Sequence, residues 1–227
     1  MENFYKDHSL HFLAVDCIIF GYEKQTLKLL LYRRDFEPAR GSWSLIGGFV
    51  KSDESCEVAA GRILQKTTGL ENIYLDQVAV FSNPQREEVA RVVTVAFVAL
   101  VNIHDKKPAT DLVGDTLWWP MTHLPKMVFD HAAMVDLALR QLQHKAGYSL
   151  VGAELLPAIF TMKQLRSLYD AIYQRKFDAG NFRKKILSLH LLERLDQKDF
   201  TGSKKGSFYY KLKPESMDAE IDRIVKF

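Results

Sequence analysis

Apolar stretches separated by polar turns dominate the first hundred residues and predict β-strands. LHFLAVDCIIFGY (10–22) and LKLLLYRR (27–34) bracket the turn GYEKQT, which predicts a β-hairpin. YLDQVAVFS (74–82) predicts a further strand, and the turn SNPQREEVAR leads from it into VVTVAFVALV (92–101). That last stretch is rich in β-branched residues and too short to span a bilayer as a helix, so we expect a buried strand.

Helical spacing of apolar residues appears within and after these strands. One helix is predicted to begin at Ser52 or Asp53 and to end at Gly69. Its apolar positions are Val58, Ile63 and Leu64. After the irregular aromatic segment TLWWPMTHLPKMVFDH, the stretch HAAMVDLALRQLQHK predicts an amphipathic helix that closes near Gly147.

A second region is predicted from about Tyr148. GAELLPAIF predicts a short helix interrupted near Pro157, and Thr161 and Asp178 are expected to cap the two helices that follow. In the last of these we expect four residues to face inward: Phe182, Ile186, Leu187 and Leu189. Two short strands around LERLDQK and FYYKLK, joined by DFTGSKKGS, complete the outline of a winged helix-turn-helix.

Charge is unevenly distributed along the chain, although the net charge is only +3. Residues 1–150 carry 16 Lys+Arg against 18 Asp+Glu, whereas residues 151–213 carry 13 against 6. A basic excess confined to one region favours a module that binds a polyanion. On charge alone, a solvated basic face is the alternative.

Composition favours a reduced, soluble environment. Cys17 and Cys56 are too few for a disulfide framework, and no C-x-x-C spacing suggests zinc. The start, MENFYKDHSLHF, lacks the basic-then-apolar layout of a signal peptide. We therefore expect a cytoplasmic protein with no membrane contact.

Residues 47–70, GGFVKSDESCEVAAGRILQKTTGL, carry a resemblance to a known family. Gly48, Glu54, Arg62 and Gly69 are similar in spacing to the Nudix box, and the glycine-rich WSLIGGFV resembles the approach to it. The resemblance implies a Nudix-type α/β/α sandwich. Nudix hydrolases cleave nucleoside diphosphates linked to another group and use divalent metal to neutralise the diphosphate.

The box departs from the family pattern where the pattern has metal-binding acids. The three positions hold Ile63, Lys66 and Thr67. Carboxylates at such helical spacing converge on a magnesium ion, whereas the ammonium of Lys66 would repel one. Glu57 lies earlier in the helix and has no acidic partner at these positions. We expect no catalytic residue, no bound metal and no cofactor.

The pocket itself is expected to remain, because fold and catalytic site are separable. Aromatic and basic residues would contact the ligand, and Lys66 would occupy the former metal position. Tyr32 and Arg34 are also expected near the cleft. The predicted effector-binding residues are Arg33, Arg40, Trp43, Phe49, Glu54 and Lys66.

The rest of the chain resembles the Nudix-related transcriptional regulators, in which a Nudix fold senses a small molecule and a winged helix binds DNA. LWWPMTHLPKMVFDHAAMVDLALRQL is similar to their W-x-P…LP…FDH segment, and residues 155–195 are similar to their DNA-binding domain. Asn181 suits bidentate contact with adenine at the front of the recognition helix. The predicted DNA-binding residues are Asn181, Arg183, Lys184, Lys185, Lys204 and Lys205.

The resulting prediction is an α+β chain with an effector-sensing Nudix-like domain at 1–147 and a winged-helix DNA-binding domain at 148–227. The resemblance implies a homodimer on a palindromic operator of double-stranded DNA. In this family the effectors include ADP-ribose in some members and free pentoses such as arabinose in others. The regulated genes would therefore serve NAD metabolism or sugar metabolism. We favour a pentose, because a neutral sugar needs no metal, and place ADP-ribose next.

Two other classes stay open at this point. A divergent Nudix hydrolase with an accessory basic domain would release phosphate or nucleotide in the presence of metal. An RNA-binding or scaffold protein would bind through its basic tail with steep salt dependence and little sequence preference.

Overall fold

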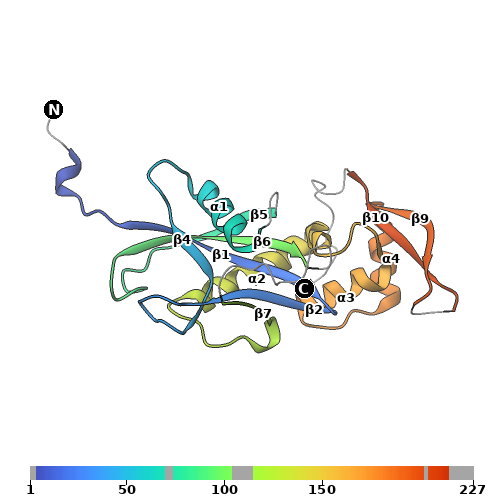
Figure 1. The fold of residues 1–227 in the computed structure, drawn as a ribbon. Coiled ribbons are helices and arrows are strands. Elements are labelled where there is room, and N and C mark those ends of the chain that lie inside the picture. The colour runs from blue at the N-terminus through green and yellow to red at the C-terminus, as the bar shows by residue number, and fades with distance from the viewer. Residues whose placement is uncertain (1–3, 70–73, 104–114, 202–203, 215–227) are drawn as a thin grey trace.

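The computed structural model describes residues 4–69, 74–103, 115–201 and 204–214. Within them, a seven-stranded sheet has the order β3-β2-β1-β6-β5, with β4 paired to β1 and β7 paired to β2 (Figure 1). Only the central pair β1–β6 is parallel among these pairings. The strands are β1 (Phe12–Glu23), β2 (Thr26–Arg33), β3 (Trp43–Ser44), β4 (Ile46–Phe49), β5 (Tyr74–Phe81), β6 (Val92–Asn102) and β7 (Thr116–Pro120).

The predicted hairpin and buried strand are confirmed. β1 and β2 pair antiparallel up to Glu23 and Thr26. The two residues between them, Lys24 and Gln25, have φ of 49° and 63°. Two successive left-handed residues form the kind of tight turn that matches the twist of a hairpin. β6 is buried along nearly its whole length.

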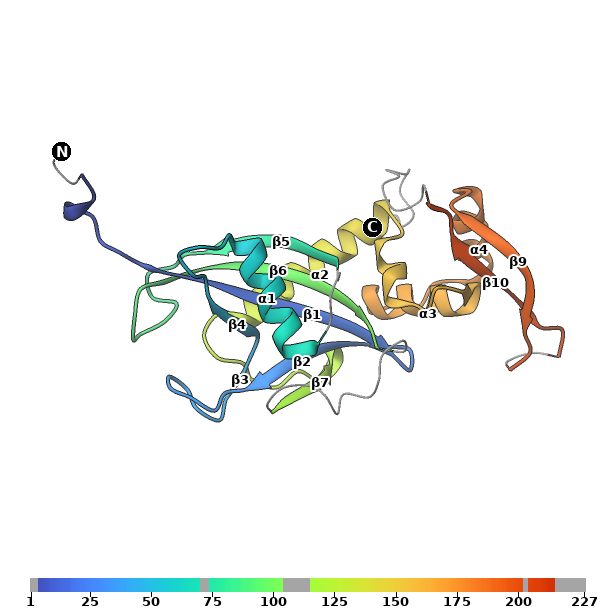
Figure 2. The same ribbon diagram turned by 45° about the horizontal axis from the view of Figure 1, so that its top comes forward.

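Two helices cover opposite faces of this sheet. Figure 2 shows α1 (Cys56–Thr68) in front of the strands and α2 (His131–Tyr148) behind them. Successive side chains of β1 point to opposite faces of the sheet. Phe20 belongs to the apolar cluster that contains α2 residues, and Ile19 belongs to the cluster that contains α1 residues. The sheet is therefore the middle layer of an α/β/α sandwich.

The first predicted helix begins later than expected. It starts at Cys56 rather than at Ser52 or Asp53, because the hydroxyl of Ser55 caps it by accepting the N–H of Val58 at 3.3 Å. Val58 is 58% exposed instead of facing the core. The predicted end is confirmed, since Gly69 has φ of 66° and its N–H donates to the carbonyl of Gln65 at 2.8 Å.

The C-terminal elements form a smaller unit with a three-stranded sheet of order β8-β10-β9 in the described residues. Both predicted caps are confirmed: Thr161 forms a capping box with Gln164, and Asp178 accepts the N–H of Asn181 at 2.8 Å. Leu187 is 36% exposed, so it does not face the core as expected. The elements are η4 (Val151–Leu155), β8 (Phe160–Thr161), α3 (Met162–Tyr173), α4 (Ala179–Ser188), β9 (Leu192–Asp199) and β10 (Ser207–Leu212).

The end of α2 joins the two parts of the molecule. The hydroxyl of Tyr173 donates to the carbonyl of Gln143 at 2.5 Å, and the side-chain amide of Gln143 donates to the carbonyl of Ile172 at 2.9 Å. The buried hydroxyl of Tyr169 donates to the carbonyl of Ala146 at 3.0 Å. One apolar cluster runs from the large sheet through α2 into α3, so α2 is packed into both parts.

Two short 3₁₀ turns, η1 (Phe4–Asp7) and η3 (Met121–His123), complete the described elements. None of the helices in the described ranges has the length and apolar character needed to cross a lipid bilayer.

Candidate functional site

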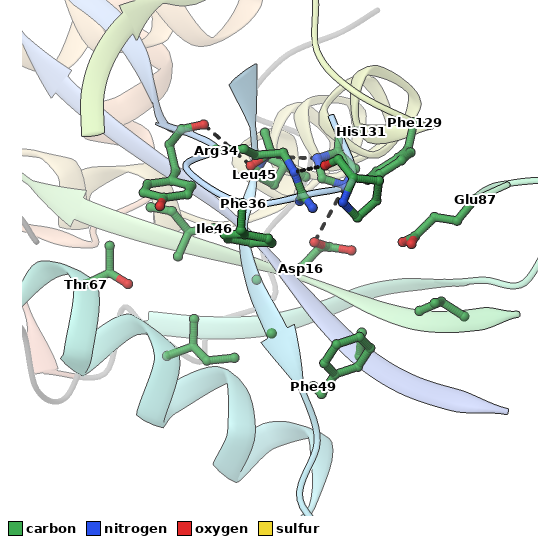
Figure 3. Close-up of a pocket in the computed structure, with 18 of the residues that line it drawn as sticks. Asp16, Arg34, Phe36, Leu45, Ile46, Phe49, Thr67, Glu87, Phe129 and His131 are labelled. Atoms are coloured by element: carbon green, nitrogen blue, oxygen red, sulfur yellow. Dashed lines mark hydrogen bonds and ion pairs between the residues drawn. The ribbon is translucent and has the colours of Figure 1, made fainter. Parts of the chain in front are cut away.

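A cavity of about 620 Å³ opens between α1, the segment after β2 and the start of α2. Figure 3 shows Phe36 and Phe129 on one side of it, Phe49 and Thr67 on the other, and Asp16 between them. Cavities of roughly 300–1,000 Å³ hold drug-sized ligands. This one is large enough for more than a single sugar ring.

The α1 wall of the cavity carries the altered box positions. Ile63, Lys66 and Thr67 all line it. The ammonium of Lys66 is exposed to solvent and, among the described residues, has no carboxylate at ion-pair distance. The described residues contain no group of three or more His, Cys, Asp or Glu side chains arranged to hold a metal ion. This wall therefore presents a positive charge to a ligand.

Glu54 and Arg62 hold β4 against α1. Nε of Arg62 donates to Glu54 at 2.9 Å, and Nη2 donates to the carbonyl of Phe49 at 3.2 Å. Glu54 also accepts the backbone N–H of Lys51 at 2.9 Å. These hydrogen bonds, with that from Arg62 the largest cause, lower the pKa of Glu54 to about 2. The pair therefore has a structural role in the box, because it joins the strand to the helix.

Arg86 forms the centre of a buried charge cluster beside the cavity. Its side chain is 2% exposed and donates to both oxygens of Asp130, at 3.1 Å from Nε and 2.9 Å from Nη2. Glu87 lies 3.1 Å from Nη1, and Asp16 lies 3.6 Å from Nη2. Burial raises the pKa of Glu87, and the attraction of Arg86 opposes that rise. The guanidinium of Arg86 is thus the shared cationic partner of three carboxylates.

His131 connects this cluster to the strand side of the cavity. Its Nδ1 accepts the backbone N–H of Leu45 at 2.9 Å, which places the proton of the neutral ring on Nε2. Nε2 lies 3.7 Å from Asp16. Burial lowers the pKa of His131, opposed by the charge of Asp16, so the ring is neutral near pH 7.

Arg34 supplies a further positive charge to the lining. Its guanidinium lies 4.4 Å from the ring centroid of Phe36 and 5.5 Å from that of Phe129. Nε donates to the carbonyl of Pro38 at 2.7 Å, which fixes the side chain. Phe129 has φ of 50°, an uncommon conformation for a residue with a side chain. The structure thus holds an oriented guanidinium between two aromatic rings at the cavity wall.

The structure brings two of the six predicted effector residues, Phe49 and Lys66, into the cavity lining. The other four lie outside it. Arg33 donates to the carbonyl of Gly41, Arg40 donates to the carbonyl of Asp35, and Glu54 is paired with Arg62. Trp43 packs edge-on against Trp119, with ring centroids 5.3 Å apart.

The sequence patterns did not identify most of the other residues that line the cavity. Tyr32 and Arg34 were expected near the cleft and do line it. The glycine-rich WSLIGGFV and the FDH motif lie in segments that contribute to the lining, but the motifs did not predict which of their side chains face the cavity. The lining residues that the prediction omitted include Asp16, Phe36, Arg86, Glu87, Phe129 and His131.

A second candidate surface lies on the smaller unit. Asn181, Arg183 and Lys184 are exposed on α4, while Lys185 is half-buried. Lys204 and Lys205 are exposed in the turn that precedes β10. Figure 1 shows α4 and the β9–β10 ribbon together at the end of the molecule away from the N-terminus. An exposed basic helix beside a β-ribbon has the layout of a winged-helix DNA-binding surface.

Comparison with known proteins decides the family. A model of the NUDIX domain matches residues 10–148, and a model of the NrtR DNA-binding winged helix domain matches residues 152–212. The structure superposes on Shewanella oneidensis NrtR complexed with a 27mer DNA with a TM-score of 0.84 and 30% sequence identity. The match covers 94% of this chain and 99% of that one. The chain belongs to the Nudix-related transcriptional regulators. As a member of this family it is a DNA-binding regulator, and the predicted α+β fold, a Nudix sandwich followed by a winged helix, is confirmed.

Other proteins similar to this chain are named either as regulators or as hydrolases. An "ADPR responsive transcriptional repressor NtrR" of Acinetobacter baylyi is 27% identical over 97% of this chain and 90% of its own length. The NUDIX domain of S. oneidensis NrtR complexed with ADP ribose is 32% identical, with a TM-score of 0.52 over 59% of this chain and 90% of that one. An ADP-ribose pyrophosphatase of Methanocaldococcus jannaschii is 33% identical over 56% of this chain and 73% of its own length.

Proposed function

We propose that this protein is a transcriptional repressor whose Nudix domain binds ADP-ribose and thereby changes the affinity of its winged helix for an operator. The observation that carries the proposal is the cavity, where Lys66 stands on the wall from which the box acids are missing. The names of the A. baylyi and S. oneidensis relatives support ADP-ribose as the ligand class. Regulated genes would then belong to NAD metabolism, and the protein would act in the cytoplasm.

Charge in the cavity favours a diphosphate over the pentose expected from the sequence. That expectation rested on the missing metal, without which the box offers no counter-charge to a diphosphate. Lys66 and Arg34 both line the cavity, and among the described residues neither has a carboxylate at ion-pair distance. They would supply the positive charge directly. The relatives named above do not mention a pentose, so that effector stays a prediction to be tested beside ADP-ribose.

The acidic side of the cavity suits sugar hydroxyls. Asp16 and Glu87 line it, and carboxyl oxygens accept hydrogen bonds from hydroxyl groups. A ligand with a diphosphate near Lys66 and a ribose near Asp16 would match both sides. Phe36 and Phe49, which are 51% and 59% exposed, offer aromatic faces to an adenine ring.

We further propose that α2 transmits the ligand's presence to the winged helix. Its first residue, His131, lines the cavity. Its last turns bond to α3 through Tyr169 and Tyr173. An 18-residue helix is a rod about 27 Å long, so a shift at its start can reach the DNA-binding unit.

A homodimer remains part of the proposal. Leu10, just before β1, is 93% exposed, and Phe12 and Leu13 at its start are 58% and 41% exposed. The Phe12 ring contacts Phe49 at 5.4 Å between centroids. Contiguous exposed apolar groups of this kind mark interaction surfaces. Sedimentation equilibrium should therefore give twice the chain mass of 26.1 kDa.

Fluorescence anisotropy with a duplex from the promoter region of its own gene tests the function. We expect tighter binding to that duplex than to a scrambled one, and a change in affinity on adding ADP-ribose but not arabinose. Incubation of ADP-ribose with the protein and Mg²⁺, followed by chromatography, tests the hydrolase alternative. Equal binding to both duplexes together with release of AMP would support the hydrolase and refute the repressor.

Substitution of Arg183 by alanine should weaken operator binding by roughly tenfold, because a bidentate base contact contributes about 1–3 kcal/mol. Arg183 is exposed in the second turn of α4, where side chains reach base edges. Anisotropy titration measures the effect, with Lys126→Ala in the Nudix domain as the control for loss of one exposed basic residue. Equal weakening on the scrambled duplex would assign Arg183 to a phosphate instead of a base.

A further inference from the structure

An exposed aromatic side chain stands at the end of the β9–β10 ribbon. Phe200 directly follows β9 and is 64% exposed. Single exposed apolar residues are common on protein surfaces, so exposure alone assigns no role. Its surroundings distinguish it: Lys198 lies two residues before it, and Lys204 and Lys205 lie just before the returning strand β10.

The backbone around Phe200 holds the ring in place. Gly206 has φ of 68°, and a Cβ added to it would lie 2.8 Å from Cε1 of Phe200. The ring therefore packs directly against the glycine backbone. On the other side, the carboxylate of Asp199 accepts hydrogen bonds from the N–H and hydroxyl of Thr201, at 2.8 and 2.6 Å. The ring is thus held against the backbone of Gly206 while most of the side chain stays exposed.

The neighbouring strand carries its basic groups on aromatic support. The charged ends of Arg194 and Lys198 both lie 4.6 Å from the ring centroid of Phe208. Such contacts hold long basic side chains in an ordered position. Figures 1 and 2 show the ribbon extending past α4, away from the Nudix sheet. The ribbon therefore combines ordered positive charge with one exposed ring.

We propose that Phe200 is a DNA-contacting residue that enters the minor groove beside the operator and presses against or between base pairs. The inference rests on the proposed operator binding and adds a contact on the ribbon. Lysines flanking the ring match the phosphates on both sides of a groove. Apolar side chains placed in the minor groove partly unstack base steps and bend the duplex, so this contact reads the deformability of the flanking sequence.

Replacement of Phe200 tests the contact on the operator of the full-length protein. Phe200→Ala should weaken operator binding about tenfold and reduce the bend measured by fluorescence energy transfer between the duplex ends. Phe200→Leu, which keeps an apolar wedge, should retain most of both. The salt dependence of binding should be unchanged in both variants, whereas Lys204→Ala/Lys205→Ala should lower the slope of log K against log salt by about 2.

Two controls separate this result from its alternatives. Leu117→Ala removes an apolar side chain of similar exposure, 50%, from the Nudix domain and should change neither affinity nor bend. Thermal unfolding of Phe200→Ala should match wild type. Wild-type affinity and bend in Phe200→Ala would overturn the inference while leaving the repressor proposal intact. A change in the dimer mass of Phe200→Ala would also overturn it, because the residue would then act on dimerisation. Absence of specific binding by the wild-type protein would refute the proposed function itself.

Discussion

Replacing Arg86 with methionine is expected to destabilise the Nudix domain by about 3–5 kcal/mol, because it removes the cation from a buried group of carboxylates. The guanidinium is 2% exposed, and the side chains of Asp16, Glu87 and Asp130 are 12%, 19% and 23% exposed. Without Arg86 these acids lose a partner that water cannot fully replace. Chemical denaturation followed by circular dichroism measures the loss, and Arg91→Met, a half-buried arginine without an ion pair among the described contacts, is the matched control.

The pH dependence of the variant provides a second readout. Burial already raises the pKa of Glu87 above its ordinary value of 4.5, and Arg86 is the largest influence that lowers it. Removing Arg86 should raise the pKa further. A carboxyl group whose pKa is raised by folding contributes stability below its unfolded pKa and loses it as pH rises through the folded value. The variant should therefore be closer to wild type around pH 5 than around pH 8, and an equal deficit at both would contradict this account.

Local sequence patterns predicted what depends on neighbouring residues. The apolar, β-branched run of β6 predicted a buried strand, as expected where helices cover both faces of a sheet. The spacing of Glu54 and Arg62 identified the box, but Glu54 was predicted to bind the effector. It precedes α1 and pairs instead with Arg62, eight residues later in the chain. Caps at Thr161 and Asp178 were readable because their hydrogen bonds span three residues.

The cavity was only partly predictable, because distant segments assemble it. Arg86 follows β5, and His131 begins α2; their shared contact with Asp16 of β1 has no signature within any one window. Arg33 and Arg34 are adjacent in sequence, yet only Arg34 lines the cavity. Arg33 donates to the carbonyl of Gly41, whereas Arg34 donates to that of Pro38. The FDH motif supported the family resemblance, but it did not show that its Asp130 pairs with Arg86.

The second large effect concerns Lys66, whose replacement by glutamate should abolish the response to ADP-ribose. Lys66 lies in the cavity lining on α1. A charge at about 4 Å from a phosphate contributes up to about 4 kcal/mol at an effective dielectric constant of 20. Lys66 is exposed, so solvent reduces this. Charge reversal both removes the attraction and adds repulsion, and we expect ADP-ribose affinity to fall at least about 100-fold, which corresponds to about 2.7 kcal/mol.

Operator binding without ligand should stay at the wild-type level in Lys66→Glu, because the residue lies in the Nudix cavity and not on α4. The operator affinity of the variant should therefore be the same whether or not ADP-ribose is present. Isothermal titration with ADP-ribose and anisotropy on the operator measure the two properties separately. Gln65→Glu adds one negative charge at the neighbouring exposed position of α1, outside the cavity lining, and should change ADP-ribose affinity by no more than about twofold.

Lys66→Gln distinguishes attraction from repulsion at the same position. If the ammonium attracts the diphosphate, as proposed, the neutral variant should bind ADP-ribose with an affinity between those of wild type and Lys66→Glu. The advantage of wild type over Lys66→Gln should also shrink with added salt, because the group is exposed. Wild-type affinity in Lys66→Gln would show that the ligand's phosphates lie elsewhere. A gain of Mg²⁺-dependent ADP-ribose hydrolysis in Lys66→Glu would show instead that the cavity holds a metal once an acid returns to that wall, since carboxylate oxygens are the ligands Mg²⁺ prefers.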